Sequence, residues 1–525
     1  MEENYYLKIG SASDLNGRDK IIYRAFEILP AFLSWSTLLS VILFSWIAPA
    51  FIAIFIIIFD IYWIIKSFFL SFHLSADWKK MKRNLKTDWE EKLNTLYAVN
   101  PEKNWNELSQ IIILPLYKES FEIVSGCIEA LLYAKWPNEK MFVVLSYEER
   151  AGDDSAKTAE AIKEKYGGAF ANFLITRHPK NLPGEKPGKG SNICWAGELA
   201  KKEIVEKFKL SQEKILVSAF DIDTIIESQY FLILAYNFLT AKDPLRSSFQ
   251  PVPVYNNNIW QAPFFSRVAA VSGTFWQMMQ QERPERLATF SSHSMTFKAL
   301  NDVGFWQKNM VSEDSRIFWN CFLYYNGDYK VVPLSYSVSM DANLGKTFWQ
   351  TAKNVYKQQR RWTWGVENLP YILFGFLKNK KIPFKKKLRY GFIQIEGFWS
   401  LATNPLMIFL LGWLPLLLGG QEFNATLLSY NLPRMTRDLM NIALLGLVGS
   451  AIISTSLLPK IPEGIKKRKY VSMVLQWIFI PFTIIFFGAI PGLEAQTRLA
   501  LGGKFRLGFW VTPKERTVKP SERVA

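Results

Sequence analysis

The sequence predicts an α/β domain held between two sets of membrane-spanning helices. Hydrophobic residues make up 49% of the 525-residue chain. They crowd into roughly the first 75 and the last 140 positions, where apolar runs are long enough for membrane spans. The middle of the chain alternates short apolar runs with amphipathic stretches, which is the pattern of strands and helices in turn. A chain of this length is expected to contain more than one structural unit.

The first two spans are predicted to form a tight helical hairpin. Residues 28–47 are an uncharged run of 20 residues, the length that crosses a bilayer as a helix. Residues 50–70 are a second apolar run, interrupted by Asp60 and Lys66, and it follows the first almost directly. The first run is too long for a signal peptide and has no small-residue cleavage site, so we expect no cleaved leader.

Three further spans are predicted near the C-terminus, at residues 392–418, 440–458 and 471–490. Clusters of Lys and Arg flank the spans at residues 8–24, 79–83, 378–387 and 466–469. Because positive flanks stay in the cytoplasm, the N-terminus and the large middle region are expected to be cytoplasmic. The sequence thus predicts a multi-pass protein of the inner or plasma membrane.

The formal net charge is +17. The basic clusters lie beside the apolar spans, and no nucleic-acid-binding module is visible. The positive-inside rule and attraction to anionic inner-leaflet lipids therefore explain the charge better than a nucleic acid does. We predict membrane lipids, and no nucleic acid, as partners. The three cysteines lack metal-ligand spacing and are interpreted as structural.

The middle region is predicted to form a right-handed α/β sheet. Short apolar runs indicate buried strands at residues 111–114, 141–145, 173–176 and 215–220. Helices are predicted between them at residues 121–134, 155–166 and 191–210. Strands that alternate with helices form such a sheet, and its ligands bind beyond the carboxyl ends of the strands.

Asp221-Ile222-Asp223 directly follows the fourth predicted strand. Side chains alternate along a strand, so the two carboxylates are expected to point the same way. Two carboxylates at the mouth of a sheet can hold a hard divalent cation. On its own this pattern is also common in solvated loops, but its place after a buried strand favours a metal site.

Val311-Ser-Glu-Asp314 leads into a helical stretch at residues 315–325. One interpretation is a helix start, with Ser312 as the cap and both acids stabilised by the helix dipole. A second interpretation makes Asp314 a general base that takes a proton from a hydroxyl group. The two are compatible, because a helix start can position a base.

Gln358, Arg361 and Trp362 are spaced to lie on one face of a helix just before the basic flank of the third span. Arg361 could pair with a phosphate and Trp362 could stack on a ring. The alternative is an interfacial helix that is anchored beside the membrane by Arg and Trp.

In this order, the motifs resemble those of the family 2 glycosyltransferases, in particular the membrane-embedded processive branch that includes cellulose, hyaluronan and chitin synthases. The family pattern is Pro-x-Tyr-x-Glu after a strand, then Asp-x-Asp, Thr-Glu-Asp and Gln-x-x-Arg-Trp. This chain has Pro115-Leu-Tyr117-Lys-Glu119, Asp221-Ile-Asp223, Ser312-Glu313-Asp314 and Gln358-Gln-Arg-Arg361-Trp362. The resemblance covers residues 108 to about 390, and the flanking spans match the family's layout.

The resemblance implies a GT-A type domain with a Rossmann-like mixed sheet, which transfers a sugar with inversion from a nucleotide-sugar donor. It implies Mg²⁺ or Mn²⁺ bound by Asp223, with Asp221 serving the metal and the nucleotide. Asp314, beside Glu313, would be the catalytic base. The other implied donor contacts are Pro115, Tyr117, Glu119, Arg361 and, within the Lys/Gly/Asn-rich stretch 186–192, Lys189; Gln358 and Trp362 would lie at the diphosphate and the acceptor.

The chain departs from the family pattern after the second strand. Many relatives carry an Asp pair that contacts the nucleotide, and this chain has Glu148-Glu149 there. Either glutamate could still accept a hydrogen bond from a uracil or ribose group, so a UDP-sugar donor is expected. His293 falls where relatives contact the acceptor, and a hydrogen-bonded structural histidine is the alternative.

The C-terminal tail contains Phe509-Trp-Val-Thr-Pro-Lys514, which is similar to the Phe-x-Val-Thr-x-Lys gating segment of cellulose synthases. Such a loop would close over the nucleotide, and the alternative is a basic tail without structure. Five spans from a cytoplasmic N-terminus would place the tail outside. Either a further crossing lies between Arg389 and Leu418, or the last run is re-entrant and bent near Pro481.

These predictions divide the chain into five parts. They are a transmembrane hairpin (residues 1–78), a linker (79–107), a cytoplasmic GT-A domain (108–388), C-terminal transmembrane helices (389–492) and a basic tail with a possible gating segment (493–525). The leading hypothesis is a synthase that extends a polysaccharide and exports it. The alternatives are a non-processive transfer of a single sugar to a membrane lipid and a non-catalytic transport or scaffold subunit.

Overall fold

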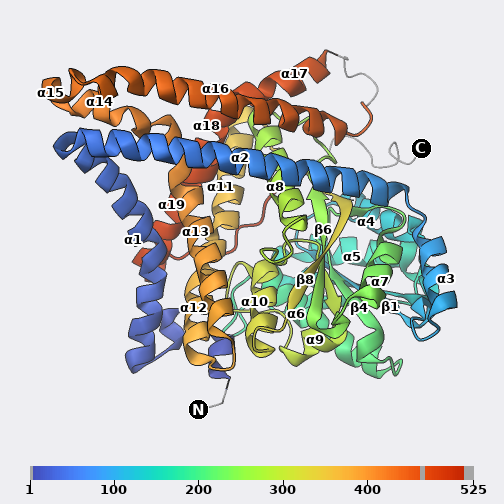
Figure 1. Ribbon diagram of the computed structural model, residues 1–525. Coiled ribbons are helices and arrows are strands. Elements are labelled where there is room, and N and C mark those ends of the chain that lie inside the picture. Colours follow the sequence, from blue (N-terminus) through green and yellow to red (C-terminus); the bar gives the residue numbers. More distant parts are fainter. Residues whose placement is uncertain (1–3, 462–467, 514–525) are drawn as a thin grey trace.

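The computed structural model describes residues 4–461 and 468–513, without the side chains of residues 443–448. A sheet domain lies at one end of the molecule, and long helices lie beside it and run across its top (Figure 1). The predicted fold class, an α/β domain between helices that could span a membrane, is confirmed.

In the described part of the chain, eight strands form one mixed sheet in the order β3-β2-β1-β4-β7-β6-β8-β5. β1 pairs in parallel with β2 and β4, and β2 with β3. β7 runs antiparallel between β4 and β6. The strands are β1 (Ser109–Leu116), β2 (Met141–Glu148), β3 (Asn172–His178), β4 (Ile215–Ala219), β5 (Ile225–Ile226), β6 (Ser247–Val254), β7 (Ser294–Thr296) and β8 (Lys330–Ser339).

The parallel strands are apolar because both faces of the sheet are covered. In β1, Ile111 and Ile113 belong to one buried cluster, whereas Ile112 and Leu114 belong to another. Successive side chains of a strand point to opposite faces, so each cluster fills one side of the sheet. The connecting helices are α4 (Phe121–Tyr133), α5 (Asp153–Tyr166), α6 (Lys189–Ala200) and α7 (Tyr230–Thr240).

The predicted N-terminal hairpin consists of α1 (Gly17–Ile47) and α2 (Pro49–Lys86). Among the described residues, three helices are long and apolar enough to cross a membrane: α1, α2 and the run Lys469–Leu501. A fourth candidate is the pair α13 (Phe384–Phe409) and the apolar helix that ends at Leu418, which is bent by 49°. The pair coincides with the predicted third span and is either a broken span or a re-entrant segment.

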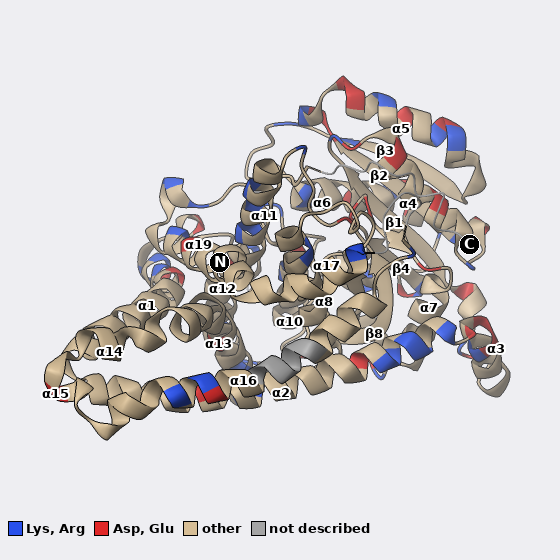
Figure 2. Cartoon of the chain, turned by 90° about the horizontal axis from the view of Figure 1, so that it is seen from above, with Lys and Arg blue, Asp and Glu red and all other residues tan. Residues whose placement is uncertain are grey.

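The predicted fourth span, residues 440–458, covers the second half of α16 (Leu427–Ser456) and the two residues after it, and α16 packs along α2 (Figures 1 and 2). Part of that prediction falls on residues 443–448 and part of its basic flank on residues 466–467, which are outside what the structure describes. Figure 2 shows charged residues of both signs along α3 (Trp89–Val99) and α5, whereas most of α1 and all of α14 (Leu414–Leu418) consist of uncharged residues. This contrast fits an aqueous sheet domain and a lipid-facing helical part.

The last candidate span continues to Leu501, beyond its predicted end, and includes α18 (Ile480–Ile484) and α19 (Ile490–Leu501). A bend of 49° lies between α13 and the helix that ends at Leu418, within the stretch where a hidden crossing is predicted. After α19 the chain returns to the sheet domain, where Arg506 pairs with Glu27 of α1 at 2.6 Å. The described tail thus lies on the side of the sheet domain, whereas Lys514 is outside the described residues.

Candidate active site

Two carboxylates follow the central strand β4 in a turn. Asp221 is a quarter exposed, and its Oδ2 accepts a hydrogen bond from the Ser291 hydroxyl at 2.7 Å. Asp223 is buried, and its Oδ2 accepts the backbone N–H of Asp341 at 3.1 Å, just beyond β8. The two carboxylates therefore lie at the carboxyl end of the sheet, as predicted, but in different surroundings.

Lys189, the first residue of α6, joins Asp221 to the acidic motif at the start of α10 (Glu313–Tyr324). Its Nζ lies 2.6 Å from Asp221 Oδ1 and 3.0 Å from both carboxylate oxygens of Asp314. Burial lowers the pKa of Lys189, but the charges of Asp221, Asp314 and Glu313 outweigh burial and raise it. The ammonium is therefore charged and compensates the acids around it.

Asp314 and Glu313 are neighbours with different environments. Asp314 keeps 21% of its side chain exposed, beside Lys189. Glu313 is buried, and a Cβ added to Gly190 would lie 3.0 Å from the Glu313 Cβ. Burial raises the pKa of Glu313, the charge of Asp314 raises it further, and Lys189 acts in the opposite direction. Of the two acids, Asp314 is the one that an acceptor hydroxyl could reach.

Glu367 holds the backbone in front of this motif. Its Oε1 accepts the N–H groups of Val311 at 2.9 Å and of Ser312 at 2.8 Å. Ser312 is at the N-cap position, but its side chain makes no capping hydrogen bond, so the predicted cap is wrong. Burial raises the pKa of Glu367, but nearby Lys186, Arg506 and Arg316 outweigh burial and lower it. An ionised, buried carboxylate thus fixes the backbone just before α10.

His293 is fully buried in the segment that leads into β7. Its Nδ1 lies 2.9 Å from the Phe290 carbonyl oxygen and 4.0 Å from Asp314 Oδ1. Burial lowers the pKa of His293, which keeps the ring neutral. A neutral ring that donates from Nδ1 to a carbonyl is what a hydrogen-bonded structural histidine would show. At 4.0 Å from Asp314, the ring lies behind that carboxylate.

The Gln-x-x-Arg-Trp motif lies on α11 (Phe348–Thr363). The Trp362 ring packs between Tyr255 and Phe290, with ring centroids 5.6 and 5.9 Å away. Arg361 and Gln358 are half-buried on the same helix. Burial raises the pKa of Tyr255, with further contributions from Asp221, Asp223 and Asp314. The side chain of Tyr255 therefore lies between Trp362 of α11 and the carboxylates Asp221 and Asp223 that follow β4.

The predicted nucleotide pocket is at the ends of β1 and β2. The sheet register aligns Leu116 with Tyr147, which brings Tyr117 beside Glu148. Glu148 is buried and pairs with Arg150, whose guanidinium lies 4.6 Å from the Tyr117 ring centre. Glu119 accepts the Tyr117 N–H at 2.8 Å and so shapes the turn after Pro115.

Glu149 is turned away from this pocket. It pairs with Arg177 at 2.6 Å and accepts the Lys180 N–H at 3.1 Å. Those bonds, the Lys180 N–H first, lower its pKa. Of the two glutamates in the predicted donor site, Glu148 is therefore the one placed beside Tyr117.

The tail packs against the site. Arg361 lies 5.0 Å from the centre of the Phe509 ring, and Lys357 lies 5.3 Å from the centre of the Trp510 ring. A Cβ on Gly188 would lie 2.5 Å from Phe509 Cγ, and Gly188 has φ +150°. Only glycine gives both this backbone conformation and this close approach.

The donor set suits a divalent metal only in part. No group of three or more metal-ligating side chains occurs within residues 4–461 and 468–513. Asp221 and Asp223 provide hard oxygen ligands at one place, and Mg²⁺ is commonly held by one or two carboxylates plus the phosphates of a substrate. The residues fit such a shared site, which would be completed by a diphosphate.

Three residues of the site were not anticipated: Tyr255, Glu367 and Arg150. Tyr255 follows the buried strand β6 directly, which was a usable signal. Glu367 is a lone acid in an apolar helical stretch, and such an acid is buried only when it is paired. No pattern in the sequence predicts the contact of Arg150 with the Tyr117 ring.

Comparison with known protein families identifies one family whose model matches this chain. The family model described as Glycosyl transferase family group 2 matches residues 216–487. No curated protein matches the chain.

Two of the similar solved structures are distant. The mannosyltransferase PcManGT from Pyrobaculum calidifontis, in complex with GDP-Man and Mn²⁺, is 12% identical with a TM-score of 0.40 and covers 76% of this chain and 99% of its own. S. aureus TarS 1-349 in complex with UDP-GlcNAc is 15% identical with a TM-score of 0.33 and covers 68% of this chain and 95% of its own.

The family match begins in β4 and includes Asp221, Asp223, Asp314 and Trp362, around which the candidate site is built. It spans just over half of the 525 residues. The chain therefore belongs to glycosyl transferase family group 2 and is a glycosyltransferase.

Proposed function

We propose that this glycosyltransferase moves a sugar, with inversion and with a divalent metal, from a UDP-sugar to a growing polysaccharide at the membrane. The observation that carries the proposal is the convergence of Asp221, Lys189 and Asp314 at the carboxyl end of the sheet. This arrangement combines phosphate-binding, metal-binding and base functions in one place.

The donor is proposed to enter between the ends of β1 and β2. Tyr117, supported by Arg150, would pack against the base, and Glu148 would accept a hydrogen bond from the base or the ribose. Pro115 and Glu119 would shape this turn. Lys189 and Arg361 would bind the diphosphate, because both are cations beside the carboxylates. Lys189 would then exchange one carboxylate partner for a phosphate.

Asp223, with Asp221, would hold Mg²⁺ or Mn²⁺. The metal would neutralise the charge of the diphosphate leaving group. Asp341 is part of this arrangement, since its N–H orients the Asp223 carboxylate.

Asp314 is proposed to be the catalytic base. The acceptor hydroxyl would give its proton to an Asp314 oxygen and form a bond to the anomeric carbon as the bond to the diphosphate breaks. The buried Glu313 and the neutral His293 would position Asp314 and would not touch the substrate. Gln358 and Trp362 would bind the diphosphate and acceptor ends, with Trp362 stacked against the acceptor sugar.

Repeated transfer and export are part of the proposal. They are supported by the position of α11, which packs on α19 through an ion pair of Arg360 with Glu494 at 2.7 Å. The acceptor site therefore adjoins a candidate span. A single transfer to a membrane lipid is the second candidate. It is favoured by a pocket of aromatic side chains that α11 shares with the last candidate span.

The proposed layout keeps the five parts of the chain expected from the sequence. The catalytic domain, residues 108–388, would be cytoplasmic in an inner or plasma membrane. Basic flanks and the return of the tail to Glu27 support this orientation. Phe509 would belong to a gating segment that closes over the nucleotide.

The test uses purified enzyme with Mg²⁺ or Mn²⁺ and a panel of nucleotide sugars. Nucleotide release and product length are measured for each donor. We expect release with one donor, loss of release with EDTA, and long products. Short lipid-linked products would favour the second candidate.

Asp314→Asn is expected to abolish release, whereas Asp154→Asn, an exposed position on α5, is expected to leave it unchanged. Undiminished turnover in Asp314→Asn, or no turnover with any donor, would overturn the proposal.

A further inference from the structure

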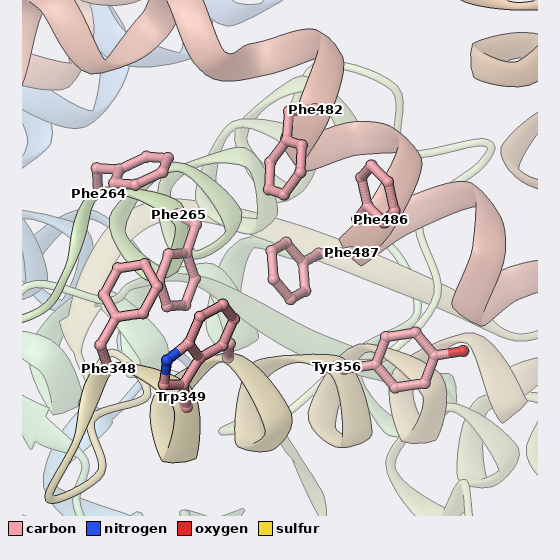
Figure 3. Close-up of a pocket in the computed structure, with 9 residues that line it drawn as sticks. Phe264, Phe265, Phe348, Trp349, Tyr356, Phe482, Phe486 and Phe487 are labelled. Carbon is pink, nitrogen blue, oxygen red and sulfur yellow. The ribbon is translucent and has the colours of Figure 1, made fainter.

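An aromatic pocket lies between α8 (Phe264–Gln281), α11 and the last candidate span (Figure 3). Its volume is about 440 Å³, and eight of its nine lining side chains are aromatic. The ninth is Ala352 of α11. The volume lies within the usual range for a small-molecule site.

The pocket has a buried floor and an exposed rim. Phe265 and Phe487 form the floor, stacked with ring centroids 5.4 Å apart. On the rim, Trp349 is 79% exposed, and Phe482 and Phe486 are nearly half exposed. Because the last two belong to a candidate membrane span, the open side of the pocket adjoins lipid.

The lining excludes a polar occupant. It contains only two polar side-chain groups, the Tyr356 hydroxyl and the Trp349 indole N–H. The hydroxyl donates to Glu494 Oε2 at 2.7 Å and points away from the other rings (Figure 3). A sugar would lose hydrogen bonds on entering, whereas a hydrocarbon chain has none to lose.

The backbone of one wall is irregular. Residues Ile485–Ala489 form a π-helical turn within the last candidate span, and this turn carries Phe486 and Phe487. π-Helical turns are rare and occur often at functional sites. This irregular turn places Phe486 and Phe487 on one wall of the pocket.

Cations flank the pocket on α11. Lys353 lies four residues after Trp349 and three before Tyr356, so it is their neighbour on the helix surface. Lys353 is exposed and forms no ion pair within the part of the chain that the structure describes. Lys357 lies one turn further on, over the Trp510 ring of the tail. The pocket thus combines an apolar interior with positive charge beside it, which complements an anionic lipid.

The same helix leads to the candidate active site. Trp362 is six residues beyond Tyr356, which is roughly 9 Å along the helix axis and about 240° around it. Tyr356 faces Glu494 of α19, whereas Trp362 faces Tyr255 and Phe290, so a lipid head group and its glycan would run both along and around α11. We infer that the pocket holds the hydrocarbon chain of a lipid-linked acceptor, a long-chain lipid phosphate whose glycan reaches Trp362. This inference rests on the second candidate given under the proposed function, transfer to a lipid acceptor, and names the class of that acceptor.

The test is photo-crosslinking of the full-length enzyme in nanodiscs. One probe is a polyprenyl phosphate with a diazirine in its chain, and the comparison probe is a phosphatidylcholine with the same diazirine. We expect the polyprenyl probe to label peptides around residues 348–356 and 482–487. Unlabelled polyprenyl phosphate should compete, and phosphatidylcholine should not. Equal labelling by both probes, with competition by phosphatidylcholine, would mean bulk lipid and would overturn the inference.

Ala352→Trp fills the pocket and is expected to abolish the label. The matched control is Ala130→Trp, on a half-buried position of α4, which should keep it. If Ala352→Trp fails to fold, Lys353→Gln is the second variant, and it should weaken competition about fivefold, the effect of one cation near an anionic headgroup. Label retained at full strength in the folded variants would refute the pocket as the site.

Nucleotide release is measured on the same samples. Labelling without release from any donor would leave the pocket standing and reject the proposed function. Nucleotide release without labelling would reject the pocket as the lipid site and leave the proposed function standing.

Discussion

Replacement of the buried Glu367 by glutamine tests how the catalytic motif is held. Glu367 is fully buried and accepts two backbone N–H groups in front of Asp314. Glutamine keeps an acceptor oxygen but removes the charge. A hydrogen bond to a charged group contributes about 1.5–3 kcal/mol, and one to a neutral group about 0.5–1.5 kcal/mol. The two bonds together should therefore lose about 2–3 kcal/mol.

The loss should appear in two measurements. The midpoint of thermal unfolding in detergent should fall, and kcat for nucleotide release should drop, by about 100-fold at most if the whole loss acts on Asp314. The KM for the donor should change little, because Tyr117 and Glu148 are untouched. Glu160→Gln, an exposed position on α5, is the matched control. If the two variants behave alike, the reasoning about Glu367 is refuted.

The effect of Glu367 should depend on pH in one direction. Its folded-state pKa lies below the ordinary 4.5, so its contribution to stability is fully present above pH 4.5. That contribution is lost as the pH falls through the depressed value. The difference in stability between wild type and Glu367→Gln should therefore be constant above pH 4.5 and disappear in acid.

Three further predictions concern the site. Lys189→Met should reduce kcat/KM for the donor about 100-fold, which is the effect of losing a buried charged contact. The control Lys157→Met, at an exposed position on α5, should leave kcat/KM unchanged. Phe509→Ala should raise the donor KM and Phe505→Ala should not, as measured by nucleotide release, because only Phe509 packs against Gly188. The pKa of His293 is lowered from 6.5, so wild-type stability should fall as the pH drops below 6.5, and His293→Asn should lose that slope in thermal unfolding.

The parallel half of the sheet was predictable because it obeys a local rule. Strands buried on both faces appear as unbroken apolar runs, so β1 to β4 and the carboxylates after β4 follow from the sequence. β7 was not predictable, since Ser294–Thr296 is too short and polar to give a periodic signal. Its antiparallel place between β4 and β6 depends on tertiary contacts.

The details of the site depended on packing between distant segments. Glu148 and Glu149 were equivalent in the sequence, and only the register of β1 with β2 separates them. The contact of Lys189 with Asp314 joins positions 125 residues apart, which no spacing rule reveals. The side chain of Ser312 does not make the cap that its local position suggests, and the backbone before α10 is held by Glu367, which is 55 and 56 residues further along the chain than the two residues it binds.

The ion pair of Arg506 with Glu27 has a consequence for the order of assembly. The two residues are 479 positions apart in the chain. At about 5–20 residues per second, a ribosome needs roughly half a minute to a minute and a half to add that stretch. During that time Glu27 has its helix neighbour Arg24 and the backbone N–H of Ala12 as partners. Glu367 likewise waits for Arg506, so the proposed base Asp314 is fully supported only after the last helix has been made. A nascent chain that stalls before Arg506 would carry all its candidate spans and no finished catalyst.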